Sequence, residues 1–514
     1  MPTRPIRFFH RGTIIEVSDA TPTRTVLDWL REDARHTGTK EGCNEGDCGA
    51  CTVVIGEAAA PGDPAAVRGL SLKTVNACIQ FLPTLHGKAL FSVEDLKAIN
   101  AGQPHPVQQA MVECHGSQCG FCTPGFVMSL WSTYERHQAG ASRQSHTPTR
   151  QQLADELSGN LCRCTGYRPI LDAGQRMFDL PAVALDTEPV LAALKQIAVA
   201  GRFEYAPGTD RFLAPTTLDE LAALREAMPQ AQLLAGSTDV GLWVNKQFRR
   251  LGDILYVGEV AEMKTITTSD TELIIGAGAS LEAAWGALAQ RWPTLTDVWL
   301  RFASPPIRNA GTMGGNVANG SPIGDSAPVL LALDAQVELR KGARVRRMAL
   351  TGFYTDYMKN QLEADEFLQA IVVPLGHPAR QVRAYKISKR FDCDISALCA
   401  GFAIELDGDV VKSVRLAYGG MAAIVKRGAR AESVLVGSTW SAATVRAAQA
   451  ALAEDFKPLS DMRASAAYRL QVAQNLLRRF WLETRAENPL PSSATSVFSV
   501  MPHETTVNDA SAVA

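Results

Sequence analysis

Nine of the eleven cysteines lie before residue 165, and their spacing points to metal or redox chemistry. Cys43, Cys48 and Cys51 follow the spacing C-x4-C-x2-C, which is typical of plant-type ferredoxins that bind a [2Fe–2S] cluster. Such a cluster needs a fourth thiolate, for which Cys78 is the candidate. The residues between the first three cysteines are small or turn-forming, so this loop can wrap around an inorganic core. A structural zinc site is the alternative, but zinc sites favour paired C-x2-C knuckles, and we predict a cluster.

A second set of four cysteines comes from two pairs, Cys119-x2-Cys122 and Cys162-x-Cys164. Each pair lies at the edge of a predicted helix, and Cys122 directly precedes Thr123-Pro124, a typical helix start. The N–H groups at a helix N-terminus favour negative charge and therefore thiolates. These pairs predict a second all-cysteine site, for which zinc is again an alternative to a cluster.

Three cysteines remain outside the two sets, and the sequence assigns them no chemistry. Cys114 is interpreted as an ordinary helix cysteine, because four ligands exist without it. Cys393 and Cys399 are interpreted as small buried hydrophobic residues.

Two glycine-rich turns in the rear of the chain have the character of phosphate-binding turns. The segment Gln232–Asp239 is an apolar strand that runs into a polar glycine turn, and Thr312–Asn316 is a second such turn. Consecutive N–H groups suit a pyrophosphate, and glycines let the backbone approach a ligand. Gly276-x-Gly278 resembles a dinucleotide fingerprint, but Leu281 occupies the position of the third glycine, so we do not expect a cofactor there.

Strands must position the first cysteine set and helices the second. The segment IRFFHRGTIIEV is expected to form a hairpin around Arg11-Gly12, followed by a helix with Val26, Leu27 and Leu30 on one face. Behind Thr123-Pro124, an apolar stripe predicts a helix buried along one side. That stripe consists of Phe126, Val127, Leu130, Trp131 and Tyr134.

Further elements carry local signals of their own. Thr149-x-x-Gln152 is a capping box, and Leu153, Leu157 and Leu161 recur behind it at every fourth residue. Near the end of the chain, a hairpin is expected with Asp407-Gly408 at its turn. A long helix near 461–485 follows, with inward-facing residues Leu470, Ala473, Leu477 and Trp481.

Length and composition limit the possible functions. The chain has 514 residues, 46% of them hydrophobic and 20% charged, with a formal net charge of −2. This length is too great for one hydrophobic core, and the near-zero charge gives no support for nucleic-acid binding. No apolar run approaches the length of about 18 residues that a membrane span needs, and the N-terminus does not resemble a secretory signal. We therefore expect a cytoplasmic protein whose clustered cysteines serve metal or redox chemistry.

Taken together, these motifs resemble the xanthine dehydrogenase family of molybdenum hydroxylases. The resemblance rests on CNEGDCGAC, GSQCGFCTPGF and NLCRCTGYRPI in front and on LLAGSTDVG, RFASPPIRNAGTMGGNVANGSPIGDSAP and YKISKRFDCDIS behind. It covers roughly residues 5 to 485 and is nearest to the small iron–sulfur and flavin subunit of the bacterial members. The molybdopterin domains of the family have no counterpart here.

The resemblance implies a multidomain α+β fold. Its parts are expected to be a β-grasp [2Fe–2S] ferredoxin domain over 1–92, a helical-bundle [2Fe–2S] domain over 93–180, a linker over 181–208, an FAD domain of the vanillyl-alcohol-oxidase type over 209–376, a C-terminal α/β domain over 380–488, and an unpacked tail over 489–514.

The resemblance also implies which residues bind the cofactors. The cluster ligands are expected to be Cys43, Cys48, Cys51 and Cys78 for one cluster and Cys119, Cys122, Cys162 and Cys164 for the other. The residues matching FAD contacts are Gln232, Leu233, Leu234, Ala235, Gly236, Ser237, Thr238, Asp239, Phe302, Thr312, Met313, Gly314, Gly315, Asn316, Asp325, Leu368 and Lys386. Tyr357 and the loop 389–394 match a region near the nicotinamide site, although Cys393 stands where the family usually has an acid.

The implied function is electron transfer between subunits. A large molybdenum-binding partner, in an α2β2 assembly, would convert hypoxanthine or xanthine to urate. Electrons would then pass through the two clusters to FAD and on to NAD+, so no residue of this chain is expected to oxidise substrate. Three alternatives remain open at this point: the equivalent subunit of a hydroxylase for aldehydes or N-heterocycles, a zinc-stabilised binding protein, and a stand-alone reductase that passes electrons from NADH to a dye.

Overall fold

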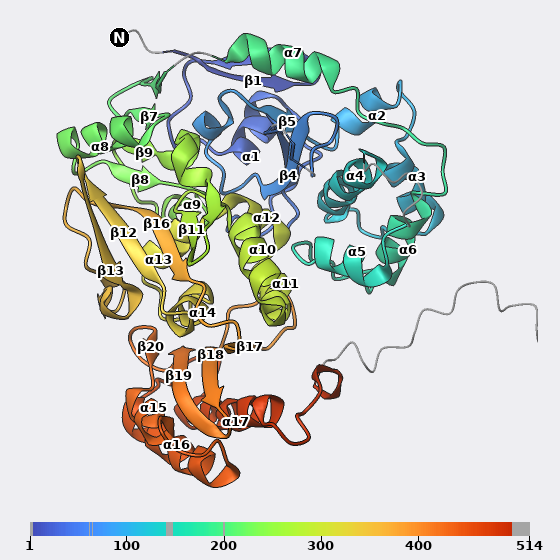
Figure 1. The fold of residues 1–514 in the computed structure, drawn as a ribbon. Coiled ribbons are helices and arrows are strands. Elements are labelled where there is room, and N and C mark those ends of the chain that lie inside the picture. Colours follow the sequence, from blue (N-terminus) through green and yellow to red (C-terminus); the bar gives the residue numbers. More distant parts are fainter. Residues whose placement is uncertain (1–3, 61, 64, 140–146, 199–200, 496–514) are drawn as a thin grey trace, which may run out of the picture.

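A computed structural model describes residues 4–60, 62–63, 65–139, 147–198 and 201–495. Figure 1 shows a sheet-rich front, a helical unit beside it, a central unit and a C-terminal unit. The predicted multidomain α+β fold is confirmed. Among the described residues, no helix is both long and apolar enough to cross a bilayer.

The front unit is a five-stranded sheet with the order β2-β1-β5-β3-β4. Its strands are β1 (Ile6–His10), β2 (Thr13–Val17), β3 (Thr52–Ala58), β4 (Leu70–Asn76) and β5 (Ala89–Phe91). The predicted hairpin is confirmed, with Arg11 at φ 49° and Gly12 at φ 80°. Helix α1 (Val26–Asp28) continues as a π-helical turn (Trp29–Asp33) and buries Val26, Leu27 and Leu30 as predicted.

The second unit is helical and contains the predicted apolar stripe. Its helices are α2 (Asp95–Ile99), α3 (Pro106–Glu113), α4 (Thr123–Ala139), α5 (Arg150–Glu156) and α6 (Arg168–Arg176). All five residues of the stripe on α4 are buried. The capping box of Thr149 and Gln152 is confirmed. Because α5 ends at Glu156, Leu161 does not continue its apolar face and lies in the following loop.

The segment 181–208, predicted as a linker, has structure of its own. Helix α7 (Glu188–Ile197) packs near β1, and strand β6 (Phe203–Tyr205) pairs with β7 (Phe212–Ala214). Both elements form because each buries an apolar face. On α7 this face consists of Val190, Leu194 and Ile197, and on β6 it consists of Phe203 and Tyr205.

The central unit contains two larger sheets, with the orders β6-β7-β9-β8 and β10-β11-β16-β12-β13. Their further strands are β8 (Gln232–Leu234), β9 (Ile254–Tyr256), β10 (Ile266–Thr268), β11 (Glu272–Gly276), β12 (Gln336–Lys341), β13 (Arg344–Ala349) and β16 (Phe367–Pro374). The helices are α8 (Leu218–Ala227), α9 (Val240–Asn245), α10 (Leu281–Arg291), α11 (Thr296–Arg301), α12 (Pro305–Ala310), α13 (Met313–Ala318) and α14 (Ser326–Ala332), and β14 (Tyr354–Asp356) pairs with β15 (Lys359–Asn360).

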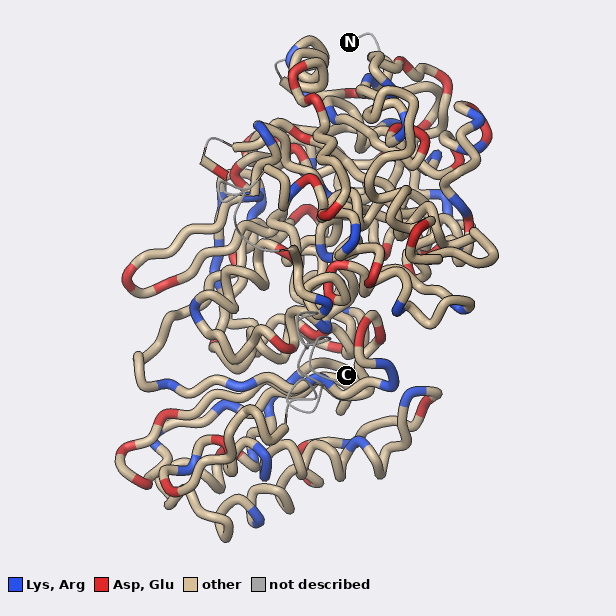
Figure 2. The backbone as a smooth tube through the Cα atoms, turned by 90° about the vertical axis from the view of Figure 1, so that its right-hand side faces the viewer, with Lys and Arg blue, Asp and Glu red and all other residues tan. Residues whose placement is uncertain are grey.

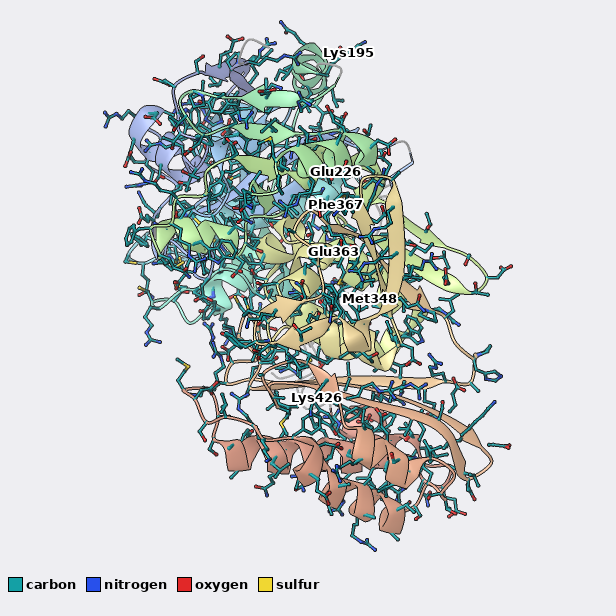
Figure 3. The ribbon with its side chains drawn as sticks, turned by 90° about the vertical axis from the view of Figure 1, so that its left-hand side faces the viewer. Lys195, Glu226, Met348, Glu363, Phe367 and Lys426 are labelled. Atoms are coloured by element: carbon teal, nitrogen blue, oxygen red, sulfur yellow. The ribbon has the colours of Figure 1, made fainter. Side chains whose placement is uncertain are left out.

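The C-terminal unit is a four-stranded sheet packed against helices, and it lies below the central unit in Figure 3. Its strands are β17 (Gln381–Ile387), β18 (Leu398–Asp407), β19 (Val410–Gly419) and β20 (Lys426–Arg427), and its helices are α15 (Ala429–Leu435), α16 (Ala442–Asp455) and α17 (Ala466–Thr484). The predicted hairpin and long helix are confirmed, although the two residues between the strands are Gly408 and Asp409. Of the predicted tail, residues 496–514 lie outside the described residues.

Basic and acidic residues are interspersed along the described chain, as Figure 2 shows. At the boundary between the central and C-terminal units, Arg415 Nε lies 2.7 Å from Asp334 Oδ1. Arg427 contributes a second ion pair to the same oxygen at 3.5 Å. Ion pairs therefore help to join these two units.

Candidate iron–sulfur and flavin sites

The first cysteine set converges as two pairs of thiols. The thiol of Cys48 contacts Cys43 and holds the pKa of Cys43 down, to about 5. The thiol of Cys78 contacts Cys51 and lowers the pKa of Cys51 in the same way. Within each pair, one thiol therefore stabilises the thiolate of the other.

Backbone N–H groups of the loop point at the sulfur atom of Cys43. Asp47 and Cys48 donate from their N–H groups to Cys43 Sγ at 3.4 and 3.3 Å. The loop curls because Gly46 and Gly49 adopt φ values of 80° and 69°, which side chains rarely tolerate. This curl is what brings N–H groups to face sulfur.

The second cysteine set also converges in pairs, but at the surface. Cys119 contacts Cys164, and both are exposed, whereas Cys122 contacts Cys162 and both are half-buried. The N–H of Phe121, together with Cys164, lowers the pKa of Cys119. Burial raises the pKa of Cys122 to about 12. The site lies between the start of α4 and the loop before α6.

The arrangement of the cysteine thiols in two pairs distinguishes a [2Fe–2S] cluster site from a zinc site. A [2Fe–2S] cluster takes four thiolates divided between two irons, whereas a structural zinc site gathers four ligands around one ion. The donor sets at both sites therefore fit [2Fe–2S] clusters, and the zinc alternative is not favoured.

A buried polar junction joins the two cysteine sites. The N–H of Leu161 donates to the carbonyl of Cys48 at 3.0 Å, so the residue before Cys162 touches a residue of the first set. The Asn160 amide donates to the Gly49 carbonyl and to Thr52 Oγ1, both at 3.1 Å. Gly49 must be glycine, because a Cβ there would lie 2.1 Å from the Gly159 carbonyl oxygen.

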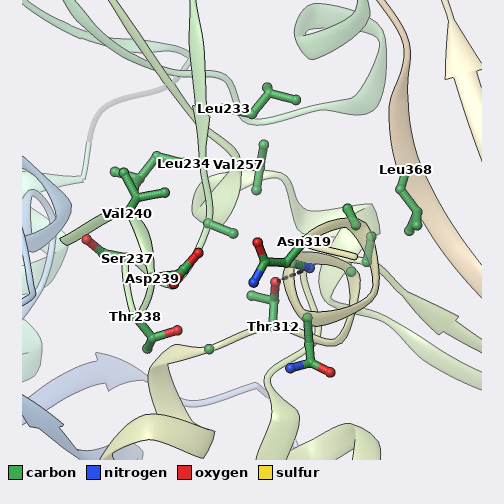
Figure 4. A pocket seen from close by; sticks show the side chains of 18 of the residues that line it. Leu233, Leu234, Ser237, Thr238, Asp239, Val240, Val257, Thr312, Asn319 and Leu368 are labelled. Carbon is green, nitrogen blue, oxygen red and sulfur yellow. Dashed lines mark hydrogen bonds between the residues drawn. The ribbon is translucent and has the colours of Figure 1, made fainter. Parts of the chain in front are cut away.

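A cavity of about 310 Å³ lies where the two glycine-rich turns meet. Figure 4 shows Ser237, Thr238 and Asp239 on one side of it and Thr312, Asn319 and Leu368 on the other. All of Gln232–Asp239 lines the cavity, together with Thr312, Gly314, Gly315, Asn316 and Leu368. The two turns predicted from sequence are therefore brought together.

Close packing of the two turns explains their glycines. A Cβ on Gly236 would lie 1.8 Å from the Ala310 carbonyl oxygen, and one on Gly314 would lie 2.4 Å from Ala277 Cβ. Thr312 caps helix α13 by accepting a hydrogen bond from the Gly315 N–H at 3.0 Å. This cap leads the backbone along the cavity wall.

Two buried polar atoms at the cavity have no partner among the described residues. They are Ser237 Oγ and Asn316 Oδ1, and both residues line the cavity. Buried polar atoms are almost always hydrogen-bonded, so an unpaired donor and acceptor at a cavity indicate a polar ligand. The Ser237 hydroxyl can donate to the pyrophosphate of FAD, whereas Asn316 Oδ1 is an acceptor and fits a hydroxyl or N–H group of that ligand.

Four predicted FAD residues do not line the cavity. Met313 and Phe302 are buried, and the Phe302 ring packs 5.9 Å from that of Trp285. Lys386 Nζ lies 2.6 Å from Asp325 Oδ2, and both side chains are buried. Ser396 accepts from Lys386 and donates to Asp325, which ties the C-terminal unit to α14.

The loop 389–394, matched to the nicotinamide region, touches the first cysteine loop. Arg390 pairs with Asp47 at 3.4 Å, and the buried Cys393 thiol lies 3.8 Å from Asp47 Oδ1. Burial raises the pKa of Cys393 to about 11. Tyr357 is 61% exposed.

The cavity also has lining residues that sequence reasoning missed. They are Val240, Trp243, Val257, Met263, Ala277, Leu281, Gly311, Ala318, Asn319, Leu362 and Phe367. Ala277 and Leu281 belong to the Gly276-x-Gly278 joint, whose glycines pack against the Met263 backbone. These residues carry no local signal, because only the tertiary fold brings them together.

Four family models match successive parts of the chain. Residues 8–81 match a 2Fe-2S iron-sulfur cluster binding domain, and residues 92–175 match a [2Fe-2S] binding domain. Residues 203–376 match the FAD binding domain in molybdopterin dehydrogenase, and residues 383–484 match the CO dehydrogenase flavoprotein C-terminal domain. The match to the FAD binding domain starts at Phe203, the first residue of β6, which agrees with the pairing of β6 and β7 in one sheet.

Similar proteins include large oxidoreductases. A xanthine dehydrogenase from Emericella nidulans is 30% identical over 95% of this chain and 39% of its own length. Aldehyde oxidase 2 from Rattus norvegicus is 27% identical over 94% of this chain and 39% of its own. The chain thus spans about two fifths of the length of these relatives. The solved structure of reconstituted CO dehydrogenase from Oligotropha carboxidovorans is 26% identical, with a TM-score of 0.50, over 53% of this chain and 96% of that chain.

Proposed function

We propose that this chain transfers electrons within a xanthine dehydrogenase. Its four domains fit the iron–sulfur and flavin subunit of the molybdenum hydroxylases. Electrons from a molybdenum centre in a partner subunit enter at the second cysteine site. They pass to the first site and then to FAD, which delivers them to NAD+.

The order of the sites in space carries this proposal. The second site is open to solvent at Cys119 and Cys164. The junction at Leu161 and Cys48 links it to the first site, where Cys51 and Cys78 are buried. The first site adjoins the flavin cavity, because Gln80 donates to the carbonyl of Gly236 at 3.1 Å. The exposed second site, the first site with its buried cysteines and the flavin cavity therefore adjoin one another in that order.

The residues of this chain would bind and orient the cofactors and exclude water from them. The eight cysteines would hold two one-electron clusters, and FAD, when bound, stores two electrons and releases them as hydride. The N–H groups of the 43–51 loop stabilise thiolate charge, and the 232–239 turn would offer N–H groups to a pyrophosphate. The N–H groups of residues 313–316 already donate within the protein, so the second turn contributes its glycines as a closely packed wall. Burial of Cys51 and Cys78 keeps water from the relay.

The choice of xanthine as substrate rests on two supports. Relatives named xanthine dehydrogenase align along most of this chain. Cluster and flavin units also lie on one chain, in that order, as the resemblance implies. The runner-up is the same role for an aldehyde or N-heterocycle hydroxylase, which the similarity to an aldehyde oxidase supports.

The proposed partner is a molybdenum-binding large subunit in an α2β2 assembly, and it would cover the second site. Apolar side chains are exposed around that site, with Val112 at 74%, Phe121 at 48% and Tyr167 at 40%. A surface hollow of about 510 Å³ adjoins them between α3 and α4. Exposed apolar residues that cluster in this way are typical of protein interfaces.

The first experiment is a determination of iron, acid-labile sulfide, FAD and zinc in the purified chain. We expect iron and sulfide in equal amounts, about four of each per chain, together with about one FAD and no stoichiometric zinc. Zinc in place of iron, without flavin, would remove the electron-transfer proposal.

The acceptor and the substrate need separate measurements. With FAD bound, NADH should bleach the flavin absorbance anaerobically, and a chain that uses only oxygen would not respond. With the large subunit present, xanthine and an aldehyde should be compared as reductants of the clusters. Faster reduction by the aldehyde would favour the runner-up.

A further inference from the structure

The segment 78–80, called here the bridging segment, runs between the first cysteine site and the flavin turn. Its Gln80 side chain donates to the Gly236 carbonyl of that turn. Ile79 packs on Gly241 of α9 so closely that a Cβ on Gly241 would lie 2.9 Å from Ile79 Cβ. At the other end, the Asn245 amide donates to the Cys78 carbonyl at 2.7 Å.

Two neighbouring residues of the central unit reach the peptide groups of cluster ligands. Asn245 donates to Asn44 Oδ1 at 3.1 Å as well as to the Cys78 carbonyl. The Lys246 ammonium donates to the carbonyl of Cys43. Because Cys43 and Cys78 belong to different thiol pairs, these two residues touch the ligands of both iron positions.

Helix α9 connects these contacts to the flavin cavity within a few residues. It starts directly after the 232–239 turn, where the Gly241 N–H donates to the Ser237 carbonyl at 2.8 Å. It ends at Asn245. Figure 1 shows α9 next to the front sheet. One short helix therefore lies against the flavin turn at its start and the ligand loop at its end.

The contacts of Asn245 and Lys246 should shift the reduction potential of the first cluster upward. Reduction adds one negative charge to a cluster, so hydrogen-bond donors and cations nearby stabilise the reduced form and raise the potential. Asn245 is half-buried, and its effect is only weakly screened by salt. The Lys246 side chain is 42% exposed and lies 3.9 Å from Glu45 Oε2, so salt should screen its charge.

We propose that Asn245 and Lys246 are positioning residues by which the flavin domain raises the reduction potential of the first cluster. They act through the peptide groups of Cys78 and Cys43. This inference rests on the proposed function, because it requires a cluster at the first site.

The test is a redox titration of the loaded chain, followed by electron paramagnetic resonance of each cluster. We expect the first-cluster potential to fall in the order wild type, Asn245→Ala, Asn245→Asp, because the carboxylate replaces a donor with a negative charge. Loss of the hydrogen bond to the Cys78 carbonyl, the one that reaches a ligand, should shift the one-electron equilibrium between the clusters about fivefold toward the second. The second-cluster potential should stay constant and serves as the internal control.

Lys246 provides a second, surface variant that keeps the test decisive if Asn245→Asp does not load. Lys246→Ala should lower the first-cluster potential at low salt and less so at high salt, whereas Lys246→Arg should keep it. Gln247→Ala is the matched control, because Gln247 is exposed and next in sequence. Its potentials should equal those of the wild type.

Two outcomes would overturn the inference. One is an unchanged first-cluster potential in both Asn245→Ala and Lys246→Ala at normal iron, sulfide and FAD content. The other is an equal shift of both clusters. Failure of the proposed function is distinguishable, because it would appear in the wild type as an absence of reducible iron.

Discussion

Asn160 is buried where the two cysteine loops meet, and it bonds to three partners there. Its amide reaches Gly49 and Thr52, and its Oδ1 accepts from Ser129 at 2.7 Å. Asn160→Ala should cost about 2 kcal/mol, because buried groups lose their partners. The temperature at which the visible cluster absorbance disappears should fall. Gln151→Ala, which removes only a half-buried hydrogen bond to Asp155 along α5, should lower that temperature much less.

Gly236 decides whether the flavin turn can close. Gly236→Ala should abolish FAD retention, since the added methyl would overlap the Ala310 carbonyl. The measurement is the ratio of FAD to iron after gel filtration. Gly286→Ala in α10 is the control, because its Cβ would meet only Trp299 at 3.6 Å. Retained FAD in Gly236→Ala would show that this packing is not required.

At the scale of residues, the cysteine sites were predictable and the cavity lining was only partly so. Cysteine ligands follow a short spacing, because one loop must supply three of them. The lining residues Trp243 and Ala277 come from different elements and have ordinary chemistry. Asp325 and Lys386 resemble FAD contacts, yet they bind each other, and no local pattern reveals that pairing.

His105, at the start of helix α3, makes the stability of the helical unit depend on pH. His105 caps α3, its Nδ1 accepts from the Val107 N–H at 3.3 Å, and burial lowers the pKa of His105 to about 4. The unfolded chain therefore takes up this proton first as the pH falls. Stability from His105 is complete above about pH 6.5 and declines toward pH 4, by about 3 kcal/mol in total.

Asn is also a good helix N-cap, so His105→Asn removes the titration while keeping an acceptor. Thermal unfolding of the helical unit should then depend less on pH between about 6.5 and 4. His86, whose pKa burial lowers to about 4, contributes a slope of the same sign that should remain. An unchanged slope in His105→Asn would contradict the assignment.

Elements with their own start and stop signals were predicted from the sequence. The Arg11-Gly12 turn, the Thr149 capping box and the helix ending at Thr484 are local features, and each is confirmed. Helix α7 was not predicted, although Val190, Leu194 and Ile197 follow helical spacing and a proline stands in its first turn. Leu161 lies at the same four-residue spacing as Leu153 and Leu157, but α5 ends at Glu156, so Leu161 is not part of the helix.

At the scale of the molecule, Lys88 joins the front sheet to the central unit. Its ammonium lies 3.0 Å from Glu57 and 3.1 Å from Glu259, and its side chain is only 11% exposed. Lys88→Ala should cost about 2 kcal/mol, between the values for exposed and buried pairs. Differential scanning calorimetry should show the two units separating into distinct transitions.

Lys73→Ala is the matched control for that interface. Lys73 also pairs with Glu57, at 3.3 Å, but its side chain is 41% exposed. Its removal should change the transitions little, because exposed pairs contribute less than about 1 kcal/mol. Equal effects of the two variants would show that burial of Lys88 does not matter.

The first cysteine loop is contacted by residues from three other units. Asn160 and Gly159 cover it from the helical unit, Lys246 from the central unit and Arg390 from the C-terminal unit. The surroundings of the first site are therefore assembled from parts of the chain that lie 111, 203 and 343 residues further along. The loop reaches its final environment only once the helical, central and C-terminal units have all folded.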